Sequence, residues 1–271
     1  MTGTKPQLPD QLAQQERGFI QRDRFIRTLT MFLLVGIWVV VTEMHWVKPL
    51  FLPAPQDLWE AMKNLVVHLP EDLFASLIRR ILPGFAIGVT LGILIGVLMS
   101  MNRVGKAVFE PIVEILRPLP PLALIPLLIL WFGIGYITQI LLIAYGSFII
   151  MVVNSFEAVR NVPPIYLHAA TMLGAKPRQI FRQVIIPCIV PDIIAGIRVS
   201  AAASFGYCVA AELMGAMTGL GYRLVLARRY LMTGNIIVIL VVIAILSFAI
   251  DFGIRRADMS ITSWKSRIVQ K

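Results

Sequence analysis

Residues 118–156 read PLPPLALIPLLILWFGIGYITQILLIAYGSFIIMVVNSF and contain no Asp, Glu, Lys or Arg. A membrane-spanning helix needs about 20 predominantly apolar residues. The 39 residues of this stretch are enough for two such helices, and Gly133, Gly135 and Tyr136 lie near its middle. We therefore expect two membrane helices joined by a tight turn, with lipid as the solvent of the fold.

The composition of the whole chain supports this interpretation. Of the 271 residues, 58% are hydrophobic and only 15% are charged, whereas about a quarter are charged in a soluble domain. The two cysteines, Cys188 and Cys208, would lie about 30 Å apart on one helix, which excludes a disulfide between them. The charge-poor stretches predict an all-α integral membrane protein with six transmembrane helices, at residues 29–46, 81–101, 107–131, 137–156, 188–211 and 233–254.

The positive charges predict how these helices are oriented. If the N-terminus is cytoplasmic, 16 of the 25 Lys and Arg residues fall in inside segments, which the positive-inside rule favours. Seven fall outside, namely Lys48, Lys63, Arg79, Arg80, Arg223, Arg228 and Arg229. The polar residues 1–27 are too long for the n-region of a cleaved signal, so the first helix is expected to be an uncleaved anchor. Both termini are therefore predicted to be cytoplasmic.

The longest inside segment contains the stretch HAATMLGAKPRQIFRQVIIP, residues 168–187. It predicts two short amphipathic helices around a glycine corner. The first ends at Leu173, Gly174 takes a positive φ as helix-terminating glycines do, and Pro177 opens the second. Pro187 is expected to mark the boundary with the fifth span. The residues alone leave two roles open, because such helices can cap their own bundle or dock in a cleft of another protein.

This stretch resembles the signature of permease subunits of ATP-binding-cassette importers. That pattern is Glu-Ala-Ala, three residues, Gly, nine residues, then Ile-x-Leu-Pro, and here His168 replaces the acidic residue. The family's segment is a cytoplasmic coupling helix between helices 4 and 5 that docks in a groove of the ATPase. The resemblance implies ATPase-coupling roles for His168, Ala169, Ala170, Gly174, Ala175 and Pro187.

Three further stretches resemble the permeases for nitrate, bicarbonate, taurine and alkanesulfonates. They are FLPAPQDLWEAM (51–62), RPLPPLALIPLLILWFGIG (117–135) and AAELMGAMTGLGY (210–222). The resemblance implies a type I importer permease fold in a bacterial inner membrane. It divides the chain into a cytoplasmic tail (1–28), a first transmembrane helix with a periplasmic surface segment (29–72), the transmembrane domain (73–256) and a second cytoplasmic tail (257–271).

The resemblance also implies the partners of the chain. These are two ATPase subunits, which would bind ATP and Mg, a second copy of the permease, a periplasmic solute-binding protein and membrane lipid. The chain itself has no G-x-x-x-x-G-K-[ST] loop for ATP. No catalytic constellation, metal-ligand spacing or cofactor motif stands out in the sequence. The net charge of +10 is spread over tethered segments, which argues against nucleic acid as a partner.

Charged residues within the predicted spans are candidates for the translocation pathway or for ion pairs that join helices. They are Glu110, Glu114, Arg117, Arg198 and Glu212. The first three share a helix face, on which Glu114 can pair with Arg117 at i, i+3. Arg198 has possible partners in Asp192 and Glu212. The outer arginines can focus anions at an entrance or contact lipid headgroups.

The sequence therefore predicts an importer permease for a small anion, with taurine or another organic sulfonate ahead of nitrate and bicarbonate. Two other classes of function remain open from the residues. An ion-coupled secondary transporter often shows inverted repeats, and an integral membrane enzyme needs a catalytic constellation. Neither feature is evident in the sequence.

Overall fold

The computed structural model describes residues 26, 29–30 and 32–261. The chain divides into two units, with a boundary after Glu60. No strand occurs in the described part of the chain. After a short apolar helix, Phe32–Glu43, the helices are α2 (Pro55–Val66), α3 (Leu69–Leu73), η1 (Phe74–Ile81), α4 (Leu82–Met101), α5 (Arg103–Leu116), η2 (Pro121–Leu124), α6 (Ile125–Phe132), α7 (Tyr136–Arg160), α8 (Pro164–Met172), α9 (Pro177–Ile180), η3 (Phe181–Ile185), α10 (Ile186–Leu213), α11 (Leu220–Arg229) and α12 (Thr233–Ile261).

Four continuous helical segments are long and apolar enough to cross a membrane. They are Leu69–Met101, Tyr136–Arg160, Pro177–Leu213 and Thr233–Met259. A bent pair, α5 with Pro121–Phe132, gives a fifth if it is counted as one span. The first predicted helix corresponds to Phe32–Glu43, which is shorter than a full span. The all-helical membrane architecture is confirmed, and the number of six spans stays a prediction.

The third predicted helix, residues 107–131, is wrong as a single rod. α5 ends at Leu116, and the chain resumes as a helix over Pro121–Phe132 at an angle of 85°. Pro118 and Pro120 fall in the break, and Pro121 begins the next helix. Proline has no N–H to donate and disfavours a helical conformation in the residue before it, so the helix stops there.

The tight turn predicted in the middle of residues 118–156 is confirmed. α6 ends at Phe132, and Gly133 follows with a φ of +75°. This left-handed conformation carries little steric penalty in glycine. α7 then begins at Tyr136, so two apolar helices are joined by three residues.

The second and fifth membrane helices begin earlier than predicted. Each contains a π-helical segment, η1 or η3, that ends just before Pro83 or Pro187. The N–H of Leu82 bonds to the carbonyl of Leu77, and the N–H of Ile186 bonds to that of Phe181. The wider turn accommodates the missing proline N–H without ending the helix. Pro187 is therefore not the boundary that the sequence predicted, because one helix runs from Pro177 to Leu213.

The core of the second unit is built around α7, which packs between α4 and α10. On one side, Gly84, Gly88, Gly92 and Gly96 of α4 follow each other at intervals of four residues. A Cβ added to Gly92 would lie 2.5 Å from the Cβ of Met151, so the two helices approach too closely for a side chain. On the other side, Ser147 Oγ and Ser204 Oγ of α10 are 3.0 Å apart.

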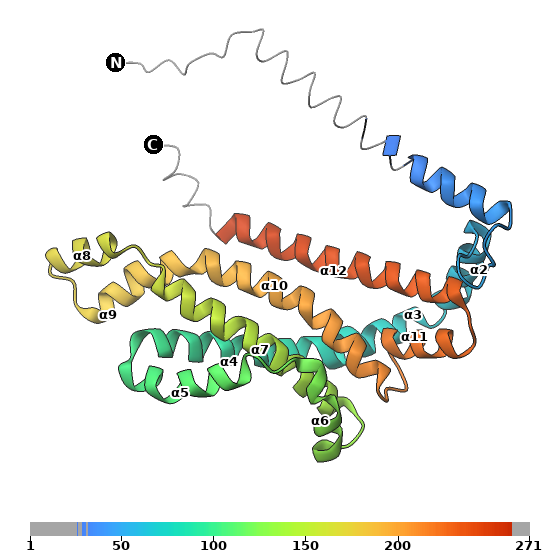
Figure 1. Cartoon of the computed structure of the whole chain (residues 1–271). Coiled ribbons are helices and arrows are strands. Elements are labelled where there is room, and N and C mark those ends of the chain that lie inside the picture. The colour runs from blue at the N-terminus through green and yellow to red at the C-terminus, as the bar shows by residue number, and fades with distance from the viewer. Residues whose placement is uncertain (1–25, 27–28, 31, 262–271) are drawn as a thin grey trace, which may run out of the picture. The chain divides into compact units, whose positions relative to one another are not determined.

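This packing places two candidate sites far apart. α4, α7 and α10 run alongside one another, with α8 and α9 at one end and α3 and α11 at the other (Figure 1). The predicted coupling residues lie at the first end. The charged residues with the most extensive contacts gather at the second end.

Candidate functional site

The glycine corner at the α8 end has the predicted geometry. Gly174 has a φ of +76°. Its N–H bonds to the carbonyl of Thr171 at 2.9 Å, and the N–H of Ala175 bonds to that of Ala170 at 3.0 Å. These two bonds form a Schellman motif, which satisfies carbonyls at the end of a helix. The second helix begins at Pro177, as expected, and the Gln179 side chain accepts the N–H of Lys176.

The surface of this corner is largely uncovered in the single chain. His168 and Ala169 are exposed, while Ala170 is half-buried. Met172 and Leu173 are 90% and 88% exposed, which leaves two large apolar side chains beside Gly174 without a cover. α8 is anchored at its other end, where Leu167 packs on the cluster around Val162 and Ile189. The corner therefore projects from a fixed base.

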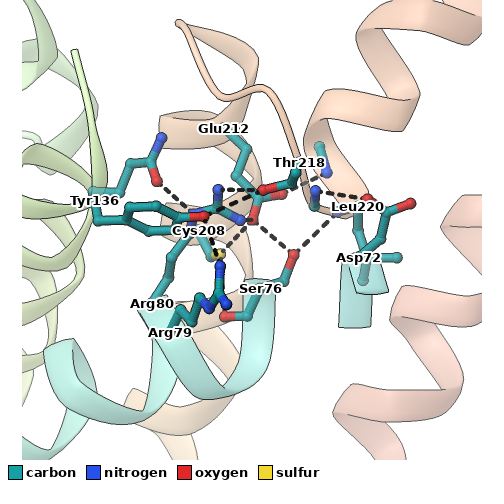
Figure 2. Close-up of polar contacts among 12 residues, drawn as sticks. Asp72, Ser76, Arg79, Arg80, Tyr136, Cys208, Glu212, Thr218 and Leu220 are labelled. Atoms are coloured by element: carbon teal, nitrogen blue, oxygen red, sulfur yellow. Dashed lines mark hydrogen bonds and ion pairs between the residues drawn. The ribbon is translucent and has the colours of Figure 1, made fainter. Parts of the chain in front are cut away.

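At the opposite end, a buried ion pair joins two helices. Arg80 of η1 donates to Glu212 at the end of α10, with 2.7 Å between Nη1 and Oε1. The two side chains are 2% and 0% exposed. Arg80 also donates to Gln139 of α7 and to Thr218 at 3.3 Å (Figure 2). Three helices and the α10–α11 loop therefore meet at one guanidinium.

The same carboxylate helps to cap α11. Gly221 N–H donates to Glu212 Oε2 at 2.6 Å, Leu220 N–H donates to Ser76 Oγ at 3.0 Å, and Gly219 N–H donates to Asp72 Oδ1 at 2.8 Å. The first N–H groups of a helix have no partner within the helix. Here side chains from α3, η1 and α10 supply the acceptors.

Two glycines are required for this arrangement. Gly219 has a φ of +111°, and a Cβ there would collide with the carboxylate of Glu212 and the guanidinium of Arg80. A Cβ on Gly221 would lie 2.7 Å from the Cβ of Glu212. In the stretch AAELMGAMTGLGY, Glu212 therefore caps α11, and Gly219 and Gly221 allow the backbone to approach its carboxylate closely enough to do so. We refer to Asp72, Ser76, Arg80, Gln139, Cys208, Glu212, Thr218, Gly219, Leu220, Gly221 and Arg223 as the Arg80 cluster.

Arg80 is on the same continuous helix as the second span and not in a loop before it. The helix begins at Leu69, so Arg80 lies between packed helices instead of before the span. Arg223, another arginine of the predicted outside segments, pairs with Asp72 at 2.5 Å. Arg228 and Arg229 are exposed, as expected of residues near an outer surface.

The predicted partners of Arg198 were also wrong. Arg198 pairs with Asp251 of α12, at 2.8 Å between Nε and Oδ1, and not with Asp192 or Glu212. Asp251 accepts from Arg255 as well, at 3.1 Å. The reason is that α10 packs against α12, which puts Asp251 opposite Arg198, while Glu212 lies almost four helical turns further along α10. The pair joins two helices, which is one of the two roles open from the sequence.

The three candidates on α5 do not form the expected pair. Glu110 pairs with Lys106 at 3.4 Å. No ion pair joins Glu114 to Arg117 among the residues that the structure describes, and both side chains are exposed. Arg117 lies where α5 gives way to the proline bend, at the end of the helix.

Sequence reasoning missed several members of the Arg80 cluster. Asp72, Ser76 and Arg80 are spaced at intervals of four and therefore share one helix face that enters an apolar helix. This spacing of polar residues on one helix face was the feature of the sequence from which their interaction could have been predicted. Gln139 gave none, because a lone amide in a charge-free run has no pattern. Within the described ranges, no three His, Cys, Asp or Glu residues could hold a metal ion, and both cysteines are free.

Comparisons with known proteins extend these observations. Residues 88–260 match the family model described as "Binding-protein-dependent transport system inner membrane component". A probable ABC transporter permease protein of Brucella abortus (strain 2308) is 38% identical over 244 residues, covering 89% of this chain and 96% of the relative. The taurine transport system permease protein of Escherichia coli (strain K12) is 34% identical over 246 residues, covering 88% and 89%.

A further relative and two solved structures agree with this relationship. A putative aliphatic sulfonates transport permease protein of Bacillus subtilis (strain 168) is 32% identical over 237 residues, covering 86% of this chain and 85% of the relative. A chain of the MetNI methionine ABC transporter, in an inward-facing conformation, has a TM-score of 0.57 at 25% identity, covering 74% of this chain and 97% of its own. An amino acid ABC transporter crystallised with histidines has a TM-score of 0.59 at 17% identity, covering 76% and 97%, which supports the fold alone.

The matched region includes Gly88, Gly92 and Gly96 of the α4–α7 contact, the Schellman corner and the glutamate that caps α11. These features and the extent of the identity lead to one assignment. The chain belongs to the family of binding-protein-dependent transport system inner membrane components, and it is a permease of the ABC importer type.

Proposed function

We propose that the chain is the membrane-spanning permease of an importer for a small anionic solute, with taurine or another organic sulfonate as the substrate. The observation that carries this proposal is the similarity to permeases named for taurine and for aliphatic sulfonates, at 34% and 32% identity over most of the chain. A formylaminopyrimidine transport permease protein is also related, at 28% identity over 72% of the chain. Nitrate and bicarbonate remain the next candidates, as other small anions.

In this proposal, a separate ATPase docks on the α8 corner. Two ATPase subunits bind ATP and Mg, and a second copy of the permease completes the membrane part. His168, Ala169, Ala170, Gly174, Ala175 and Pro187 are the proposed coupling residues. The exposed Met172 and Leu173 supply apolar surface at the same corner, which supports docking over a simple capping role.

A single long helix links this corner to the Arg80 cluster. α9, η3 and α10 form one helix of 37 residues, Pro177–Leu213, about 55 Å long at 1.5 Å per residue. One end adjoins the Gly174 corner and the other carries Glu212 of the Arg80 cluster. We propose that displacement of α8 by the ATPase moves this helix, and through it the elements held by Arg80.

The proposed topology has both termini in the cytoplasm of a bacterial inner membrane, and an external binding protein delivers the solute. Single-cysteine labelling in intact cells tests it, after replacement of Cys188 and Cys208. We expect a cysteine at position 168 to resist a membrane-impermeant reagent added outside, and one at position 228 to react. The opposite pattern would reject the orientation.

Uptake measurements test the substrate. A strain that lacks this importer and regains the gene should accumulate taurine or an alkanesulfonate in an ATP-dependent manner. Uptake of a neutral or cationic solute, with no effect of sulfonate, nitrate or bicarbonate, would reject an anionic substrate. Purification distinguishes the class of transporter, because an importer permease should co-purify with an ATPase and an ion-coupled secondary transporter should not.

A further inference from the structure

We infer that Arg79, Tyr136 and Thr218 form a binding site for an oxyanion, either the sulfonate head of a solute or the phosphate of a lipid. The three side chains come from η1, from the first residue of α7 and from the α10–α11 loop. Arg79 Nη1 lies 3.4 Å from the Tyr136 hydroxyl, and that hydroxyl lies 3.4 Å from Thr218 Oγ1 (Figure 2). Arg79 donates to the Tyr136 hydroxyl, which shares a second hydrogen bond with Thr218, and the guanidinium keeps further N–H groups for an anion beside the two hydroxyls.

The charges around this group leave one cation without a counter-ion. Arg80 is paired with Glu212, and Arg223 is paired with Asp72. Among the described residues, no Asp or Glu forms an ion pair with Arg79, whose side chain is exposed. Of these three arginines, Arg79 is therefore the one whose positive charge is not balanced by a carboxylate.

The position of Arg79 relative to the hydrocarbon core of the membrane bears on the role of this unpaired cation. Residues 81–101, which follow it on the same helix, carry no charge and are long enough to cross the hydrocarbon core. Arg79 therefore lies at the edge of that core. Charged side chains in such positions face water, a partner group or a transported ion.

The site is held in place before any anion binds. The Arg79 guanidinium lies 5.3 Å from the ring centroid of Phe74 and 6.0 Å from that of Tyr136, within the range of cation–π contacts. Arg80 lies 4.8 Å from the same Tyr136 ring and donates to Thr218. Contacts with Arg80 therefore fix two of the three side chains, Tyr136 and Thr218, and such preorganisation favours binding. The N-terminus of α7, which begins at Tyr136, adds a favourable dipole.

The site gives the proposed importer a place where an anion is recognised by the permease itself. Only the identity of the solute rests on the proposed function, since the convergence of donors does not depend on it. The guanidinium supplies charge and paired N–H groups, which suit sulfonate and phosphate oxygens. Because the Tyr136 and Thr218 hydroxyls share one hydrogen bond, the pair leaves one O–H as a further, neutral donor to the anion.

Binding is tested on the full-length permease purified in dodecyl maltoside, whose sugar head carries no phosphate. The probes are methanesulfonate and dimethyl sulfone, which have similar shapes but differ in charge. We expect methanesulfonate to raise the midpoint of thermal unfolding and dimethyl sulfone to leave it unchanged. Arg79→Gln, Tyr136→Phe and Thr218→Val should weaken the apparent affinity about tenfold or more, the range expected for a lost hydrogen bond to a charged group. Lys48→Gln, which removes another exposed cation, should bind as the wild type does.

A second arm identifies the source of the anion. If added phosphatidylglycerol stabilises the wild type but not Arg79→Gln, while methanesulfonate has no effect, the site holds a lipid phosphate. If neither compound acts, or if both act equally on Arg79→Gln, the inference is wrong. Sulfonate uptake by wild-type cells tests the proposed function separately. Wild-type uptake combined with unaltered binding and transport in Arg79→Gln would reject the site and leave the proposed function intact.

Discussion

The guanidinium of Arg80 and the carboxylate of Glu212 are separated by 132 residues in sequence and by 2.7 Å in the structure. Neither side chain has appreciable contact with solvent. Glu212 also accepts from the Ser76 hydroxyl at 2.7 Å and from the N–H of Gly221. These bonds satisfy the carboxylate from several directions, which is the condition under which a buried ion pair is tolerated.

Removing one member of this pair should be strongly destabilising. Arg80→Gln leaves the Glu212 carboxylate buried without its cation, a situation that typically costs about 3–5 kcal/mol. Thermal or denaturant unfolding of the purified permease measures the loss. The double variant Arg80→Met, Glu212→Leu should lose less stability than the two single losses add up to, because no isolated charge remains. Strict additivity would show that the two residues do not act as a pair.

The pair between Arg198 and Asp251 should matter much less. The two side chains are 29% and 30% exposed, and Asp251 keeps Arg255 as a second partner at 3.1 Å. Partly exposed pairs contribute at most about 1 kcal/mol, so Arg198→Gln should change the free energy of unfolding by less than that. A loss as large as that of Arg80→Gln would mean that Arg198 is desolvated in the assembled importer, as a residue of the pathway or the dimer contact would be.

Adding even one methyl group to the glycine-lined contact between α4 and α7 should destabilise the protein. At Gly92, a new Cβ would lie 2.5 Å from the Cβ of Met151 and 3.0 Å from the backbone of α7, which cannot yield as a flexible side chain can. Overpacking of this kind costs about 1–3 kcal/mol, so Gly92→Ala should lower the unfolding midpoint. Gly206→Ala on α10 is the matched control, because nothing lies within 4 Å of its new Cβ. Equal unfolding midpoints for the two variants would mean that α4 and α7 move apart to make room for the methyl group without loss of stability.

The sequence was sufficient for features that depend on local rules. The charge-free run of residues 118–156 predicted two apolar helices and a tight turn near Gly133. The place of Gly174 after a helix that ends at Leu173 predicted its positive φ. Both follow from the conformational freedom of glycine and from helix length. Helix ends were predicted less well, because the π-helical segments before Pro83 and Pro187 let helices continue through prolines that usually stop them.

Ion pairs across helices were not predictable from spacing. Arg198 and Glu212 lie on one helix and were considered possible partners, but their actual partners come from α12 and η1. Which residues face each other depends on how helices pack, and a single sequence does not contain that information directly. Gln139 illustrates the limit, since its role arises only when α7 packs beside η1 and Arg80 reaches it.

The α8 corner allows the coupling proposal to be tested without disturbing the core. A Cβ on Gly174 would meet no atom within 4 Å, so the effect of Gly174→Val must come from the φ of +76°, which a β-branched residue rarely adopts. Such backbone strain costs about 1–3 kcal/mol and is relieved if the Schellman turn opens and redirects the end of α8. The helices of the bundle should remain inserted.

We therefore expect Gly174→Val to weaken co-purification of the ATPase and to abolish ATP-dependent uptake, while the unfolding midpoint of the permease changes little. Ala170→Trp should have the same effect through bulk on α8. Gly206→Val is the control, because that glycine also has open space around it and has no positive φ. If ATPase binding and uptake both survive Gly174→Val and Ala170→Trp at wild-type levels, the corner only caps its own bundle. In that case the exposed Met172 and Leu173 would need another partner.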